Sequence, residues 1–473
     1  MTDDLLYMPA VEAASLIRRR KLSPVEYMAA VLAGIERAQP KLNTFVVVCG
    51  DQAMAAARDA EAAVARRETL PPLHGVPFSV KDLIDVAGLG TTHGSRIFAD
   101  NVAKADGVTP ARLKAAGAIA IGKTTTPEFG HKGLTDSPLQ GITRNPWGLD
   151  RTSGGSSGGA AAAVAAGLGP LAIGTDGAGS VRGPAATSGI VGLKGTLGAV
   201  PMDTARDVFA NNAYAGPMTR TVGDAALMFS TMTGADERDP WSLGGTPRPV
   251  SPLLTANGLA GVRIGYIERM HNRLVDADVL ANTHDSLKAL EALGAEIEPV
   301  TEPIDWIEYE GRVLYQSGIA TAMKPYMAQW RDKMDPSMVQ FADWGEGFSM
   351  HDLREANHAR TRLFQAIQRL LKRHDFLVSP TTARTALDAT FDATKDVIVD
   401  NQACGLTRQS WTAYQYPFNL TGHPAISVPS GFGRDGLPTG LQIVGRWWAD
   451  NDVLRVAALF ETARPWAHKR PAF

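Results

Sequence analysis

The chain has 473 residues, of which 44% are hydrophobic and 20% are charged, and its formal net charge at pH 7 is −2. This composition is typical of a globular protein and argues against the disordered and fibrous classes. The near-neutral charge gives no general electrostatic reason to bind nucleic acid or an anionic membrane. We therefore expect a small neutral or weakly polar substrate.

Cysteine usage and apolar runs indicate a protein of the reducing cytoplasm. Only Cys49 and Cys404 are present, without CxxC spacing, so neither a disulfide framework nor a thiolate zinc site is implied. The first residues are acidic and lack the basic and apolar regions of a signal peptide. The longest apolar stretch, Ala160–Gly174, is shorter than the roughly 20 residues that cross a bilayer, and it indicates a buried helix.

The first half of the chain predicts helices followed by a layered sheet. Residues 1–67 read as an N-terminal helical region, in which Ser23-Pro24-Val25-Glu26 combines a capping box with proline at the first helical position. From Leu73 to about Gly234, β-like runs alternate with helical runs and glycine turns, which is typical of an α/β fold. These runs are Pro77–Val80, Ala118–Ile121, Leu171–Ile173 and Ile190–Leu193.

The second half predicts that the same sheet continues. Val262–Ile267, a helical Asp276–Leu293 and Glu296–Val300 form a βαβ pattern. Residues 306–373 are helical and rich in aromatic side chains: Trp306, Tyr309, Tyr315, Tyr326, Trp330, Trp344 and Phe348. They indicate either core packing or a lid or wall over an apolar substrate pocket. Strands return at Phe376–Ser379, Ala425–Pro429 and Leu441–Val444, before a final helix from about Asn451. Without a repeat or linker, we expect one domain over residues 1–473.

The most informative segment lies between Ser153 and Ala186, where two glycine-bracketed serine sites flank an alanine-rich run. If that run folds as one helix that brings the chain back, Ser156 and Ser180 come together. A serine hydroxyl is a poor nucleophile unless a neighbouring base takes its proton, and no histidine lies in this segment. The closest in sequence is His131, which has no partner visible from spacing.

Lys81 provides the missing base. It follows the apolar residues Val76, Pro77, Phe78 and Val80, and burial lets an ammonium lose its proton when no negative charge compensates. Side chains alternate along a strand, so Asp82 should point away from Lys81. The glycines Gly174, Gly177 and Gly179 allow turns that direct successive N–H groups at one point, as in an oxyanion hole. No phosphate-binding P-loop motif is present.

These motifs resemble the signature of the amidase signature family of Ser–cisSer–Lys hydrolases. The matching segments span roughly residues 75–445, in order: Gly75–Asp82, Lys123–Phe129, Gly154–Gly159, Gly174–Ala185, Val191–Thr196, Asn419–Ala425 and Gly440–Gly445. The resemblance implies an α/β fold with a central mixed sheet covered by helices on both faces. It also implies hydrolysis of a carbon–nitrogen acyl bond in an amide, aryl amide or carbamate, and of esters, with no metal or organic cofactor.

The resemblance also assigns roles to residues. Lys81 would be the base, Ser156 the bridging serine after a cis peptide bond, and Ser180 the nucleophile that forms an acyl-enzyme. The oxyanion would face the N–H groups of Gly177, Ala178, Gly179 and Ser180. The supporting side chains would be Ser153, Ser157, Asp176 and Arg182, and the substrate-side residues would be Thr125, Thr126 and Phe129.

Four positions depart from the family pattern. Ala178 adds a methyl group beside the expected oxyanion hole, and Thr125 replaces an asparagine on the substrate side. Gly183 and Gly195 replace isoleucine and proline, which would loosen the loop that supports Ser180. None of these changes removes a catalytic group.

Three other functions remain open. The first is the amidase-like subunit of a tRNA-dependent amidotransferase, which works only with partner chains. The second is an α/β-hydrolase esterase, because Gly154–Gly158 satisfies the short G-x-S-x-G pattern; it would need His423 or another histidine as its base. The third is a non-catalytic binding homologue. For the leading function, the family implies a homodimer.

Overall fold

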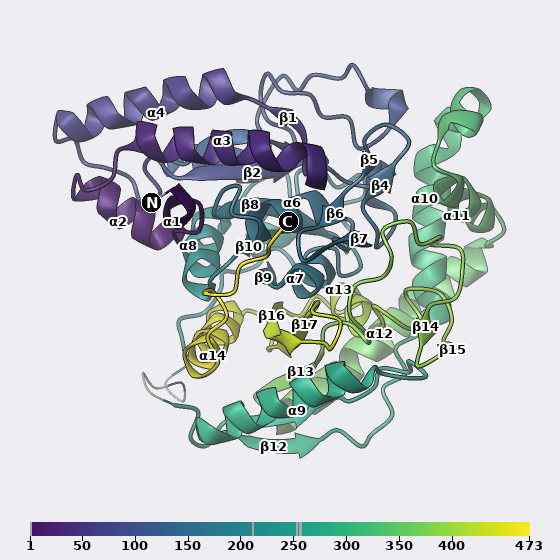
Figure 1. Ribbon diagram of the computed structural model, residues 1–473. Coiled ribbons are helices and arrows are strands. Elements are labelled where there is room, and N and C mark those ends of the chain that lie inside the picture. The colour runs from purple at the N-terminus through teal and green to yellow at the C-terminus, as the bar shows by residue number, and fades with distance from the viewer. Residues whose placement is uncertain (1, 211, 252–253, 255–257) are drawn as a thin grey trace.

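The structure is a computed structural model that describes residues 2–210, 212–251, 254 and 258–473. An 11-stranded sheet runs through it, with helices against both faces (Figure 1). In spatial order its strands are β1 (Phe45–Val48), β3 (Ile119–Thr124), β2 (Pro77–Lys81), β8 (Leu171–Asp176), β10 (Tyr214–Thr219), β9 (Val191–Lys194), β16 (Ala425–Phe432), β17 (Pro438–Val444), β13 (Phe376–Pro380), β11 (Arg263–Tyr266) and β12 (Glu296–Pro299).

The sheet is mixed, as the family resemblance implied. Strand β2 pairs in parallel with β3 and β8, and β11 pairs in parallel with β12 and β13. The strands between β8 and β13 pair antiparallel. Three short ribbons lie outside the sheet: β4 (Asp136–Ser137) with β5 (Gly141–Ile142), β6 (Arg144–Asn145) with β7 (Gly148–Thr152), and β14 (Ile398–Val399) with β15 (Gln402–Ala403).

Helices occur along the whole chain. They are α1 (Thr2–Leu6), α2 (Ala10–Arg18), α3 (Pro24–Leu42), α4 (Gly50–Ala65), α5 (Val108–Ala115), α6 (Gly158–Ala165), α7 (Arg182–Ser188), α8 (Val222–Met232), α9 (Ala277–Ala292), α10 (Glu308–Trp330), α11 (Pro336–Glu346), α12 (Met350–Arg373), α13 (Tyr416–Leu420) and α14 (Asp450–Ala463). None of the helices in the described ranges combines the length and apolar character needed to cross a membrane.

Side-chain alternation along the strands divides the core between the two faces. On β8, Leu171 and Ile173 join a cluster built with α5, α8, α9 and α14, whereas Ala172 joins a cluster with α6 and α7. Strand β13 does the same, since Phe376 and Val378 enter the first cluster and Leu377 packs against α12. The helices therefore cover both faces of one sheet.

The N-terminal region is helical as predicted, apart from one strand. Ser23 caps α3 by accepting hydrogen bonds from the N–H groups of Val25 and Glu26 at 3.1 Å each. Strand β1 interrupts the region between α3 and α4, where the sequence predicted only helix. Its four residues pair antiparallel with β3, so a tertiary partner rather than local pattern decides their conformation.

The prediction that one helix joins the two serine sites was wrong in part. Helix α6 ends at Ala165, and the glycines Gly167 and Gly169 turn the chain with φ of 73° and 112°. Strand β8 then returns the chain along the sheet. The return is therefore made by a helix and a strand, which explains how so short a segment brings Ser180 back beside Ser157.

The aromatic region forms three helices. Its side chains divide between core and surface: Trp306 is 2% exposed in the core, whereas Tyr309 is 51% exposed. Helices α10 and α11 form a closely packed hairpin at one side of the molecule (Figure 1). At their closest approach, a Cβ atom added to Gly345 of α11 would lie 2.1 Å from the backbone oxygen of Gln316.

This close approach predicts different effects for two glycine-to-alanine changes in the hairpin. Gly345→Ala should destabilise the protein by about 1–3 kcal/mol, because the added methyl group has no space. The matched control is Gly318→Ala on α10, where an added Cβ atom meets nothing within 4 Å; it should stabilise by up to ~1 kcal/mol, since alanine is the better helix former. Denaturant unfolding of both variants measures the difference, and equal stabilities would contradict the packing.

Candidate active site

Lys81 is the last residue of β2, and its fully buried amine contacts three hydroxyl groups. Nζ lies 2.7 Å from Ser156 Oγ, 2.9 Å from Ser157 Oγ and 2.9 Å from Thr175 Oγ1. Because β2 and β8 are parallel neighbours, their carboxyl ends bring Lys81 and Thr175 to the same edge of the sheet. Burial lowers the pKa of Lys81 well below its ordinary value, although the Asp176 carboxylate opposes this effect.

Asp82 points away from Lys81, as strand alternation predicted. Its carboxylate lies 3.4 Å from the buried amine of Lys123, and it accepts hydrogen bonds from the Thr92 N–H at 3.1 Å and from Gln140 Nε2 at 2.8 Å. The negative charge that follows Lys81 in the sequence is therefore held by another cation.

The two serine sites come together beside Lys81. Ser157 N–H donates to the carbonyl oxygen of Ser180 at 3.3 Å, and the Gly155–Ser156 peptide bond is cis, as the family resemblance implied. Ser157 Oγ donates to the carbonyl oxygen of Thr175 at 3.1 Å. Ser153 takes part through its backbone: its carbonyl oxygen accepts from Thr187 Oγ1 at 3.0 Å, while its buried hydroxyl has no partner in the described part of the chain.

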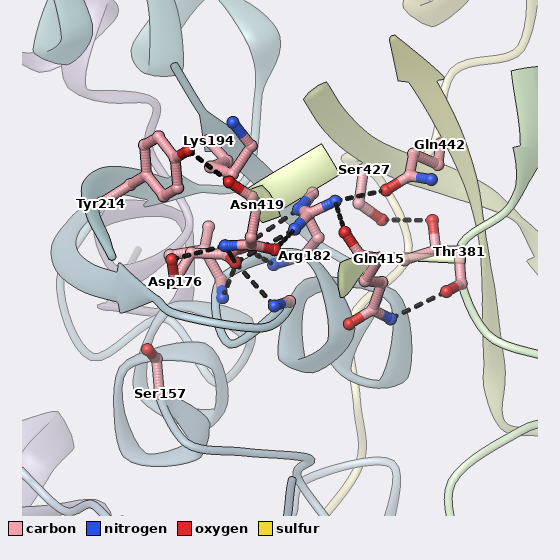
Figure 2. A network of polar contacts seen from close by, with 12 residues as sticks. Ser157, Asp176, Arg182, Lys194, Tyr214, Thr381, Gln415, Asn419, Ser427 and Gln442 are labelled. Carbon is pink, nitrogen blue, oxygen red and sulfur yellow. Dashed lines mark hydrogen bonds and ion pairs between the residues drawn. The ribbon is translucent and has the colours of Figure 1, made fainter. Parts of the chain in front are cut away.

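Asp176 and Arg182, at the two ends of the loop that contains Ser180, form a fully buried ion pair (Figure 2). Arg182 Nε and Nη2 donate to the two carboxylate oxygens of Asp176 at 3.0 and 3.1 Å. Burial alone would raise the pKa of Asp176, but the Arg182 charge and hydrogen bonds from Arg182 and Asn419 hold it well below its usual range. Asp176 is thus a fixed anion at the end of β8.

Asp176 also shapes the loop that contains the expected oxyanion hole. The N–H of Gly179 donates to Asp176 Oδ1 at 2.6 Å, and φ of Gly179 is 110°. This donor is therefore not directed at a substrate, contrary to the prediction from the sequence. In the described part of the chain, the N–H groups of Gly177, Ala178 and Ser180 have no such acceptor, and these three residues line a cavity.

Two motifs far downstream in the sequence meet at Arg182. Its Nη2 donates to Asn419 Oδ1 at 2.6 Å, and its Nη1 donates to Gln442 Oε1 at 2.7 Å (Figure 2). Nη1 also donates to the carbonyl oxygen of Gln415 at 3.0 Å. Helix α13 and strand β17 are in this way bonded to the start of α7.

Gln415, which the sequence did not single out, fills the space beside the loop. A Cβ atom added to Gly183 would lie 3.0 Å from Gln415 Oε1, and one added to Gly179 would lie 1.7 Å from it. Likewise, a Cβ atom on Gly195 would lie 2.8 Å from the Phe229 ring. Neighbouring side chains therefore occupy the space that Gly183 and Gly195 leave, while the expectation that these glycines loosen the loop stays a prediction.

The histidine required by the α/β-hydrolase alternative has different contacts. His423 is fully buried; its Nδ1 lies 2.9 Å from Thr421 Oγ1, and its Nε2 has no partner in the described part of the chain. Burial, with the nearby Lys194 charge, lowers the pKa of His423 to about 3. In the described structure, His423 contacts neither serine site and does not line the cavity.

The cavity at Ser180 is lined by residues from several parts of the chain. Gly155, Gly177, Ala178 and Ser180 form its floor, and α10 and α11 contribute Glu308, Arg312, Tyr315, Gln316 and Phe341. The remaining wall comes from Gly130–Gly133 and from Ala393, Leu406–Gln409, Thr412 and Gln415. Of the aromatic side chains singled out in the sequence, Tyr315 reaches this wall, and polar groups outnumber aromatic ones around it.

The expected substrate-side residues are not on this wall. Thr125 is buried, with its hydroxyl 2.5 Å from Thr143 Oγ1, and Thr126 Oγ1 donates to the carbonyl oxygen of Pro127 at 3.2 Å. Phe129 packs against Phe98 and His93 instead. Gly130, the residue after their motif, does approach the site, since an added Cβ atom there would lie 3.1 Å from Ser156 Oγ.

No group of three or more histidine, cysteine or carboxylate side chains within the described residues could hold a metal ion.

Known proteins are similar to this chain in both sequence and fold. The sequence matches the Amidase family over residues 26–454. It is 40% identical to an acylamidase of Rhodococcus erythropolis over 99% of this chain and 98% of that protein. It is 34% identical to one of the subunits of the glutamyl-tRNA(Gln) amidotransferase of Symbiobacterium thermophilum, covering 96% of each. The solved structure of a bacterial aryl acylamidase of the amidase signature family superposes with a TM-score of 0.89 at 30% identity, covering 98% of this chain and 97% of that one.

The lowered pKa of Lys81 predicts how stability depends on pH. Between the folded-state pKa and the unfolded value of about 10.4, the unfolded chain binds one more proton, so raising the pH favours the folded state. From about pH 8 to pH 10, the unfolding free energy of the wild type should rise relative to Lys81→Met by up to ~1.4 kcal/mol per pH unit. Denaturant unfolding across this range measures the difference. A constant difference would mean that Lys81 stays protonated in the folded protein.

Proposed function

Because this chain belongs to the amidase family and is an amidase-type hydrolase of carbon–nitrogen bonds other than peptide bonds, we propose that it forms an acyl-enzyme through Lys81, Ser156 and Ser180. The observation that carries the proposal is the contact of a buried lysine with hydroxyl oxygens, at 2.7 Å from Ser156 Oγ, while the nearest carboxylates bind other cations.

A neutral amine at Lys81 can satisfy the hydrogen bonds around it, and burial favours this form. Ser157 Oγ donates its proton to the carbonyl oxygen of Thr175, so it accepts from Lys81. An uncharged amine donates two hydrogen bonds and keeps one lone pair. If Ser157 and Thr175 Oγ1 accept the two donated bonds, the lone pair is left for the proton of Ser156.

The reaction then proceeds by proton transfer through Ser156. Lys81 takes the proton of Ser156, Ser156 takes that of Ser180, and Ser180 Oγ attacks the carbonyl carbon of the substrate. The oxyanion is stabilised by free N–H groups of the 177–180 loop, where one such donor is worth about 2.7–4 kcal/mol of the barrier. The stored proton passes to the departing nitrogen, and a water molecule, activated by the same relay, hydrolyses the acyl-enzyme.

We propose aryl amides and aryl carbamates as the substrate class, with esters as additional substrates. The structural similarity to an aryl acylamidase and the sequence similarity to an acylamidase support acyl transfer from an amine. Phe341 and Tyr315 on the cavity wall provide an apolar surface for a ring. The region over residues 306–373 acts as a wall of the substrate pocket, and the active form is a cytoplasmic homodimer.

Removing the nucleophile or the base tests this mechanism. Ser180→Ala and Lys81→Met should each lower kcat by at least about 10³-fold on p-nitroacetanilide, a primary amide or an aryl carbamate, whichever the wild type turns over. The matched control is His423→Ala, which should retain activity because the relay does not use an imidazole. Unchanged thermal unfolding of Ser180→Ala would separate lost chemistry from lost folding. Turnover by Ser180→Ala would exclude Ser180 as the nucleophile.

The purified chain alone separates a self-sufficient amidase from an amidotransferase component. We expect it to hydrolyse a simple amide or carbamate without partner chains and to elute as one species with the mass of a homodimer in size-exclusion chromatography with light scattering. Activity that appears only after a glutamine-dependent partner complex is reconstituted would favour the amidotransferase function.

A further inference from the structure

We propose that Arg408 on the cavity wall binds a carboxylate of the substrate, so that the favoured amide carries a negative charge on its acyl or its amine side. The inference rests on the proposed function, because it concerns the cavity that contains Ser180. Arg408 and Ser180 line the same cavity from opposite halves of the chain, and Arg408 is half-buried.

The other cationic side chains on the wall are already neutralised. Lys132 Nζ lies 2.7 Å from carboxylate oxygens of both Asp136 and Asp335. Arg312 Nε lies 3.0 Å from an oxygen of Glu308, which also lines the cavity. Each of these ion pairs brings its own counter-charge, so neither leaves a cation for a ligand.

His131 also lies on the wall, and burial lowers its pKa to about 4. Its Nε2 lies 2.7 Å from Ser337 Oγ, and its Nδ1 lies 2.8 Å from the carbonyl oxygen of Glu128. Both ring nitrogens are thus bonded to protein groups, and Asp335 Oδ1 lies 3.7 Å from Nε2, so His131 offers no unpaired cation to a ligand.

Arg408 differs from these side chains in its partners. Its guanidinium carbon lies 4.0 Å from the ring centre of Tyr315 and 5.1 Å from that of Tyr416. Within the described residues, it is the one cationic side chain on the wall that lies within ion-pair distance of no carboxylate. Stacking on aromatic rings fixes the plane of a guanidinium while leaving its edge free to donate hydrogen bonds.

The surrounding groups favour a carboxylate over a larger anion. The same wall carries Thr407, whose hydroxyl is a neutral hydrogen-bond donor, whereas the Thr412 hydroxyl already donates to the carbonyl oxygen of Thr407 at 3.2 Å. Because the Glu308–Arg312 pair carries no net charge, Arg408 adds a single positive charge, which a singly charged anion matches better than a phosphate. A planar guanidinium matches a carboxylate with two parallel hydrogen bonds. Arg408 is a half-buried cation without a carboxylate partner among the described residues. The carboxylate of the substrate thus supplies its counter-charge.

Three anilides test the proposal: acetanilide, which is uncharged, succinanilic acid, with a carboxylate on the acyl side, and 4-acetamidobenzoate, with a carboxylate on the amine side. Aniline or 4-aminobenzoate release gives kcat/KM for each. The wild type should prefer one carboxylate substrate over acetanilide by at least about 10-fold, mainly through a lower KM, and the side of the charge shows which half of the substrate Arg408 binds. The preference should shrink as salt is raised.

Arg408→Gln should lower kcat/KM for that substrate by about 10–100-fold and change it for acetanilide by less than about 3-fold. Arg408→Lys should keep part of the preference, since it retains the charge but not the planar fork. The control is Arg362→Gln, which removes an exposed arginine of α12 away from the cavity and should leave both rates unchanged.

Each ratio is measured within one variant, so a partly unfolded preparation does not alter it. Equal losses on the charged and uncharged substrates, or no preference in the wild type, would overturn the carboxylate site. Those results would leave the proposed function intact as long as acetanilide turnover still requires Ser180. Turnover of acetanilide by Ser180→Ala would instead contradict the proposed function.

Discussion

The lowered pKa of Lys81 depends on where the neighbouring carboxylates are held. Asp82 follows it in the sequence, and Asp176 ends the adjacent strand β8. Asp82 lies against the buried amine of Lys123, and Asp176 is paired with Arg182. Since each carboxylate already has a cation, Lys81 is left with hydroxyl groups. A buried amine in such surroundings favours its neutral form, and this is the form that can accept a proton from Ser156.

The Asp176–Arg182 pair also connects the site to the rest of the chain. Removing one partner from a buried ion pair costs about 3–5 kcal/mol, because the other charge is left uncompensated. Here the pair orients the 177–180 loop through the Gly179 N–H and is itself bonded to Asn419 and Gln442 (Figure 2). The position of the Ser180 loop therefore depends on residues more than two hundred positions downstream, on α13 and β17.

Chemistry and substrate contact come from different parts of the fold. Lys81 and the 177–180 loop lie at strand ends of the central sheet, and Ser156 lies just before α6, whereas most of the cavity wall comes from α10, α11 and the segment before α13. The wall can thus vary in charge and shape without disturbing the proton relay. Within the described residues, Arg408 is the arginine of the wall that has no carboxylate partner, and it stacks on Tyr315. By this side chain the cavity distinguishes a charged substrate from an uncharged one.

The sequence by itself determined the features that depend on local pattern. The glycines around Ser156 and Ser180 and the apolar run before Lys81 predicted the relay residues. The periodicities of helices and strands predicted the direction of Asp82 and most elements of the sheet. Strands β1 and β10 were missed. Strand β10 contains Gly216 and Pro217, and it is a strand because β8 and β9 pair with it on either side. Only the tertiary structure decided that the Gly179 N–H bonds to Asp176 and that Gln415 fills the space beside Gly183. It also decided that Arg408 reaches the Ser180 cavity, whereas Thr125 and Thr126 do not. Each of these contacts joins segments whose approach depends on the packing of the whole sheet, or on the direction of a single N–H bond in a turn, and residue type alone records neither.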